Sequence, residues 1–139
     1  MSGTEEGINL IKNNYMIEEE YVSFETAKLL KEKGFNEKVI CYYDDGGSLN
    51  LNKFVEFQCC NQGYGSGVFA APTLQMACKW LREKHNIDIC AFPEHYDYIL
   101  WGYTCKIYKN KEQFCSSENF KLYEEAVEAA IKYCLENLI

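Results

Sequence analysis

The chain has fewer basic than acidic residues and no long apolar run. Each of these two features argues against a class of binding partner. It carries 14 Lys and Arg against 21 Asp and Glu, for a formal net charge of −7, and the basic residues form no dense cluster. Nucleic acids are bound mainly through cationic side chains, so we expect no nucleic-acid partner. Anionic membrane surfaces are disfavoured for the same reason. No run of about 18 apolar residues is present, so we expect no membrane partner either.

The first residues lack the features of a secretory signal. Residues 1–20 are polar and acidic, without a basic start or a long apolar segment, so we expect a cytoplasmic protein. The 139 residues fit one hydrophobic core, because single cores organise about 100–150 residues. The predicted organisation is a polar N-terminal arm over residues 1–20 and a single domain over residues 21–139.

Motifs for catalysis, metals and cofactors are also missing. A P-loop needs Lys and then Ser or Thr directly after its last glycine, whereas the apolar residues 68–70 follow Gly67 here. His85 and His95 are the two histidines, and neither has a second ligand at a spacing typical of zinc sites. No carboxylate pair stands out as general acid and base. We therefore expect no metal, no cofactor and no enzymatic activity.

A glycine-rich stretch, QGYGSG at residues 62–67, precedes the start of a predicted helix. Backbone N–H groups of such a stretch, together with a helix N-terminus, can cradle an anion. For a small anionic ligand such as a nucleotide-like signal, the candidate binding residues are Gly63, Tyr64, Gly65, Ser66, Gly67 and Thr73. The alternative interpretation is a surface loop that joins a strand to a helix and needs no ligand.

Among the residues that are abundant, the eight cysteines come first. Such a number suits a disulfide framework in a small secreted protein, but nothing here directs secretion. We expect reduced thiols, most of which fill the core as small apolar groups. They fall within the apolar patterns of predicted strands and helices at Cys41, Cys78, Cys90, Cys105 and Cys134. A cysteine nucleophile, with Cys59 or Cys60 close to a histidine in space, is the least favoured alternative.

Apolar periodicity and capping residues predict three helices. The first spans residues 24–33, with Ser23 as its N-cap and Gly34 as the left-handed residue that ends it. The second spans residues 73–86, and the third spans about residues 123–138 with acidic residues in its first turn.

Two predicted hairpins alternate with these helices. The first contains a strand at residues 39–43, a turn at residues 45–47 and a return strand marked by Leu51, Val55 and Phe57. The order α-ββ-α-ββ-α predicts an α+β fold in which helices cover antiparallel sheet. Whether the two hairpins form one sheet or two is left open, and a resemblance between ACKWLRE and AIKYCLE leaves an internal duplication open as well.

The second hairpin is predicted within residues 87–108, with its turn at residues 93–95. A polar loop over residues 109–121 follows it. On the second strand of this hairpin, one face is formed by Ile99, Trp101, Tyr103, Cys105 and Ile107.

Eleven tyrosines are the last abundant feature. Tyr42, Tyr98 and Tyr108 lie on or beside predicted strands, and aromatic residues are favoured at protein interfaces. Ordinary cross-strand packing is the alternative explanation. We expect contact with a protein partner or self-association through an exposed aromatic sheet face, which alanine at Tyr98 and Tyr108 weakens.

Three segments of the chain read YVSFETAKLLKEKGF, APTLQMACKWLREKHNI and YEEAVEAAIKYCLENLI. They resemble a family of small uncharacterised proteins from gut anaerobes, their phages and other mobile elements. The resemblance implies a cytosolic accessory protein of mobile-element origin, and it brings no catalytic or binding residues with it. It also motivates the nucleotide-like ligand considered above, as a signal of host defence that such a protein sequesters.

Overall fold

The computed structural model describes residues 17–51, 61, 67–115 and 118–139. Within them the chain forms three helices and two three-stranded antiparallel sheets. The predicted α+β class is confirmed, and the two hairpins lie in separate sheets. In the predicted N-terminal arm, the described residues 17–20 are exposed.

Helix α2, Phe24–Glu32, begins and ends at the predicted capping residues. The Ser23 side chain accepts a hydrogen bond from the backbone N–H of Thr26. Beyond the helix, Gly34 has a φ of 91°, and the N–H of Phe35 donates to the carbonyl of Leu30 at 2.8 Å. This geometry turns Phe35 back onto the helix, where its side chain is fully buried.

The first sheet is small and has the order β2-β1-β3. It consists of β1 (Cys41–Tyr43), β2 (Leu49–Leu51) and β3 (Phe69–Ala70). The return strand was correctly predicted at Leu51, whereas Val55 and Phe57 lie outside the described residues. Strand β3 was not predicted, because two residues beside a glycine-rich stretch show no alternation.

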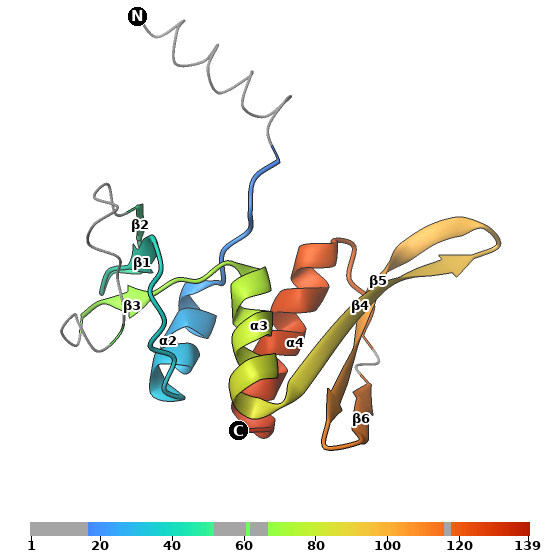
Figure 1. Ribbon diagram of the computed structural model, residues 1–139. Coiled ribbons are helices and arrows are strands. Elements are labelled where there is room, and N and C mark those ends of the chain that lie inside the picture. Colours follow the sequence, from blue (N-terminus) through green and yellow to red (C-terminus); the bar gives the residue numbers. More distant parts are fainter. Residues whose placement is uncertain (1–16, 52–60, 62–66, 116–117) are drawn as a thin grey trace, which may run out of the picture.

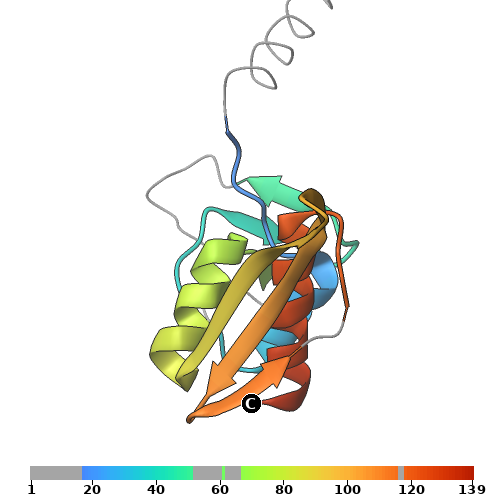
Figure 2. The same ribbon diagram turned by 90° about the vertical axis from the view of Figure 1, so that its right-hand side faces the viewer.

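Helix α3, Leu74–His85, and helix α4, Tyr123–Asn137, match the predictions within one residue at either end. Thr73 caps the start of α3, and Asn86 adopts the left-handed conformation at its end, with a φ of 55°. Both helices contact the second sheet, and they cover one of its faces (Figure 2).

The second sheet has the order β4-β5-β6 and consists of β4 (Ile87–Tyr96), β5 (Ile99–Lys109) and β6 (Glu112–Cys115). The turn predicted at residues 93–95 is wrong, because β4 continues through them to Tyr96. Proline is tolerated there because β4 is an edge strand, where a missing N–H leaves no ladder partner unpaired. The polar loop predicted over residues 109–121 is also wrong in part, since it contains β6, an edge strand of polar composition.

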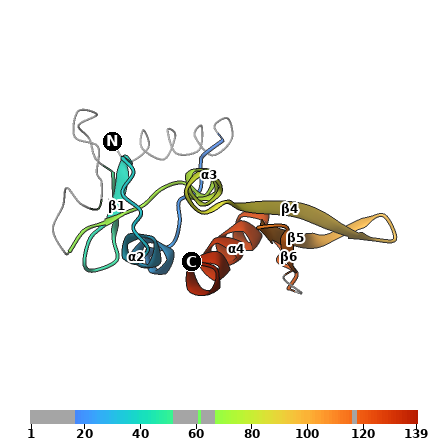
Figure 3. The ribbon, with the colours of Figure 1, turned by 60° about the horizontal axis from the view of Figure 1, so that its bottom comes forward.

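The core lies between the helices and the two sheets. It is filled by aliphatic residues of all three helices together with Trp80 and Phe35, whose rings meet edge to face at 5.4 Å. Helix α2 contacts both α4 and β3, so it lies between α4 and the first sheet (Figure 3). Glu128 of α4 fastens this contact, because its carboxylate accepts from the N–H of Ser23 at 3.0 Å and from the Thr26 hydroxyl at 2.6 Å. No helix in the described ranges is long and apolar enough to cross a membrane.

Candidate functional site

The hairpin of β4 and β5 extends beyond the body of the molecule. The end of the hairpin that holds the start of β4 and the end of β5 packs against α3 and α4. The other end, which holds the turn, projects away from every helix (Figure 1). Five large side chains of the projecting half are exposed: Tyr96, Tyr98, Ile99, Leu100 and Trp101. We call these five residues the hairpin tip.

The hairpin tip brings five exposed apolar side chains together within six consecutive residues. The exposed fraction is 71% for Tyr96, 102% for Tyr98 and 64% for Trp101. The rings of Tyr96 and Trp101 pack on one another with centroids 5.6 Å apart. Isolated apolar residues are common on protein surfaces, but a contiguous patch is typical of an interaction site.

The turn at the end of the hairpin holds a tyrosine in a conformation that tyrosine disfavours. Asp97 and Tyr98 have φ values of 48° and 65°, as expected for the type I′ turn of a two-residue hairpin loop. Glycine suits the second position of such a turn, whereas a bulky residue there costs about 1 kcal/mol. Asn110 and Lys111 adopt the same conformation in the turn between β5 and β6, with φ values of 50° and 70°, so the backbone conformation alone does not mark Tyr98 as functional.

The base of the projecting half is fastened by a segment that follows β6. Tyr103 and Phe120 exchange two backbone hydrogen bonds, of 2.7 and 2.8 Å, and the Asn119 amide donates to the Glu94 carboxylate at 3.0 Å. This segment pairs alongside β5, and its Asn119 side chain lies over Gly102, where a Cβ atom would lie 2.2 Å from Asn119 Oδ1. The β4–β5 register shifts between Glu94 and His95. Bulges of this kind bend the strands and change the direction of the residues beyond them. The bulge and these hydrogen bonds together fix the position at which the hairpin tip departs from the body.

The three predicted interface tyrosines do not share one face. Tyr98 lies at the hairpin tip, Tyr108 lies toward the other end of β5, and Tyr42 belongs to the first sheet, where it is half-buried against the core. Trp101 was placed on the same strand face as the buried Cys105, yet it is exposed. The β4–β5 register shift, in which Glu94 pairs with Gly102 but His95 pairs with Leu100, leaves Trp101 without a partner and interrupts the alternation on which that prediction relied.

Only part of the predicted glycine-rich ligand site lies within the described residues. Gly63, Tyr64, Gly65 and Ser66 lie outside the described residues, and Gly67 and Thr73 are described. The Thr73 hydroxyl already accepts from the N–H of Met76 at 3.1 Å, and the N–H of Leu74 donates to the carbonyl of Glu20 at 2.9 Å. The Thr73 hydroxyl and the Leu74 N–H, which could bind an anion at the start of α3, therefore already have hydrogen-bond partners within the protein. The ligand site stays a prediction.

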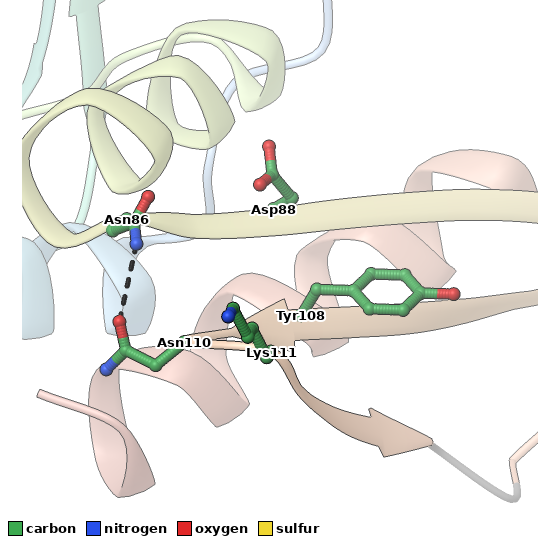
Figure 4. Close-up of a pocket in the computed structure, with 5 residues that line it drawn as sticks. All are labelled: Asn86, Asp88, Tyr108, Asn110 and Lys111. Atoms are coloured by element: carbon green, nitrogen blue, oxygen red, sulfur yellow. Dashed lines mark hydrogen bonds between the residues drawn. The ribbon is translucent and has the colours of Figure 1, made fainter.

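A separate polar pocket lies at the opposite end of α3. It has a volume of about 400 Å³ and is lined by Asn86, Asp88, Tyr108, Asn110 and Lys111. The Asn86 amide donates to Asn110 Oδ1 at 3.3 Å, and the Tyr108 ring points away from this pair (Figure 4). Because α3 rises about 1.5 Å per residue, the length of the helix separates this pocket from Thr73. The pocket is thus independent of the glycine-rich stretch.

Three of the thiols that face the core are unsuited to nucleophilic chemistry. Burial raises the pKa of Cys105 and of Cys134 to about 12, and that of Cys78 to about 11. A nucleophilic cysteine needs a lowered pKa instead. Cys90 departs from the predicted role of core filler, because it is exposed on the outer face of β4. The alternative nucleophiles, Cys59 and Cys60, lie outside the described residues.

No metal centre is found where the structure describes the chain, since no group of three or more His, Cys, Asp or Glu side chains there could hold an ion.

Comparisons of the chain with protein-family models, with curated proteins and with solved structures found no match. The hairpin tip is therefore the candidate functional site on its geometry alone.

Proposed function

We propose that the protein is a non-enzymatic cytoplasmic binding protein that acts through protein–protein contact, with the hairpin tip as its contact element. The observation that carries this proposal is the group of five exposed apolar side chains at the end of an anchored arm. Aromatic side chains supply a large share of the binding energy at protein interfaces. In the free protein these rings face water, and a partner that covers them gains their burial.

Two further observations support a binding role. Tyr98 places an exposed ring at a turn position where glycine is preferred. The raised pKa values of Cys105 and Cys134 argue against these two thiols as nucleophiles, and the cytoplasmic location rests on the sequence. A mobile-element origin rests on the sequence resemblance alone.

Affinity co-purification of the tagged full-length protein from the cells that encode it tests the proposal. We expect Trp101→Ala and Tyr98→Gly to lose the co-purifying partner, because each removes a ring from the hairpin tip. Tyr133→Ala is the matched control, since Tyr133 is an exposed aromatic residue on α4, with 42% of its surface exposed. Thermal unfolding of each variant excludes a folding defect, and Tyr98→Gly is expected to unfold at the same or a higher temperature because glycine relieves the positive φ.

Equal recovery of the partner by wild type, Trp101→Ala and Tyr98→Gly would contradict the proposal. So would loss of the partner by Tyr133→Ala alone, because that result would place the contact on α4.

A further inference from the structure

We infer that the hairpin tip inserts into a concave apolar pocket of a different protein, and that cationic side chains rim this pocket. This inference rests on the proposed function and adds the chemistry of the partner. It follows from the charge around the tip, from the shape of the arm and from the charge of the whole chain.

Along the chain, the charges of the arm are of one sign. Between Lys84 and Lys106 the chain has no Lys or Arg, and it has three carboxylates, at Asp88, Glu94 and Asp97. Asp97 lies in the turn itself, and Glu94 lies where the arm leaves the body. A partner that surrounds the tip must face these two carboxylates, and like charges across an interface cost several kcal/mol. Arg and Lys at the rim of the partner's pocket meet this requirement.

The shape of the arm requires a concave partner. A stable interface buries about 800 Å² on each side, whereas one aromatic side chain buries on the order of 150–250 Å². A flat surface that touches only one side of a narrow hairpin cannot reach that area. A pocket that encloses both sides of the arm can, because Ile99 and Leu100 are both exposed and consecutive residues of a strand point to opposite sides.

Other occupants fit the tip less well. A second copy carries the same acidic tip and the same net charge of −7, so tip-to-tip pairing brings like charges together. Anionic lipid is repelled by the same carboxylates. Strand addition along β4 is hindered because Pro93 lies in the middle of that edge strand and has no N–H to donate.

The first step of the test identifies the partner's binding surface. The photoreactive residue p-benzoylphenylalanine replaces Tyr98 in the full-length protein, within the cells that encode it, and mass spectrometry locates the crosslinked peptide. We expect crosslinks to an apolar pocket of one different protein, with Lys or Arg side chains at its rim. The same photoreactive residue at Tyr133 is the control for non-specific crosslinks.

The second step uses the purified crosslinked protein as the probe, with binding measured at low and at high salt. We expect Asp97→Lys to weaken binding about tenfold at low salt, and this difference to shrink at high salt, because salt screens exposed charges. Asp88→Lys is the matched control. It makes the same change on β4, about 30 Å from the turn that holds Asp97 at the rise of a β-strand, and we expect its effect to stay within about twofold.

The outcomes separate the inference from the proposed function. A crosslinked pocket without cationic residues, or equal affinities for wild type and Asp97→Lys, would overturn the inference and leave the proposed function standing. Crosslinks only to a second copy of this chain, or binding of the purified protein to phosphatidylcholine vesicles, would also overturn it. No crosslink specific to position 98 would remove the inference and the proposed function together.

Discussion

At the residue scale, the buried side chain of Asn61 joins two distant segments. Its amide donates to the carbonyl of Phe35 at 2.6 Å, and its oxygen accepts from the N–H of Ala70 at 2.9 Å. The sequence gives no sign of this role, because the two partners lie 26 and 9 residues away along the chain. Such a contact exists only once the first sheet has formed against the end of α2.

Asn61→Ala leaves a buried carbonyl and a buried N–H without partners. We expect it to lower the free energy of unfolding by about 2–4 kcal/mol, since each unsatisfied group costs about 1–3 kcal/mol. Urea denaturation measures the change. Asn137→Ala is the control, because Asn137 is exposed and bonds only within its own helix. An unfolding free energy of Asn61→Ala equal to that of the control would contradict the assigned role.

His85 makes stability depend on pH. Burial, and next the charge of Lys109, lower the pKa of His85 below its ordinary value of 6.5. The ring also packs on Trp80, with centroids 4.6 Å apart. Above pH 6.5 neither the folded nor the unfolded state carries the proton. Below it the unfolded state binds the proton first, so stability falls until the pH passes the lowered pKa of the folded state.

We therefore expect the unfolding free energy to decrease as the pH drops below 6.5, and His85→Phe to remove this decrease in that range. Denaturation at a series of pH values measures it. NMR titration of His95→Gln, which leaves His85 as the one remaining histidine, reads its pKa directly. A His85 that titrates above 6.5 would show the sign to be wrong.

At the element scale, helices were predictable and sheet boundaries were not. The ends of α2 and α3 are set by neighbours in sequence, such as Ser23, Gly34 and Asn86, so reading the sequence locates them. A strand depends on residues far along the chain. Residues 93–95 read as a turn because only the finished sheet makes β4 an edge strand, on which proline is accepted.

The sequence analysis likewise predicted only part of the candidate site. Tyr98 was chosen because it lies beside a strand, which is correct, but its place at the end of the hairpin depends on where the turn falls. Trp101 was assigned to the face of the core residues by alternation, which the register shift opposite Glu94 and His95 interrupts. Such a shift depends on how two strands pair, so the sequence of one strand does not show it.

Gly102 fixes where the arm leaves the body, and Gly102→Ala tests this. The added Cβ would lie 2.2 Å from Asn119 Oδ1 and 2.5 Å from the carbonyl oxygen of Phe120, at a φ of 150°. We expect a loss of about 1–3 kcal/mol in unfolding free energy, with NMR shift changes centred on residues 118–120. An unchanged stability and spectrum would show that this segment does not hold the arm.

At the scale of the whole molecule, the arm and the body are separate in composition. The body holds the core between two sheets, and the residues of the hairpin tip contribute nothing to it. The arm carries exposed rings and carboxylates on a chain whose net charge is −7. The core thus belongs to the body alone, and the arm is the part that we propose contacts a partner.

Removal of the arm tests this division most directly. A variant in which a two-residue Asn-Gly turn replaces residues 95–101 joins Glu94 to Gly102, which are paired across the hairpin. The measurement is its affinity for the partner identified by crosslinking, beside its free energy of unfolding. The account predicts that binding is lost while the unfolding free energy stays within about 1 kcal/mol of wild type. Binding at the affinity of wild type by the folded, armless protein would contradict it.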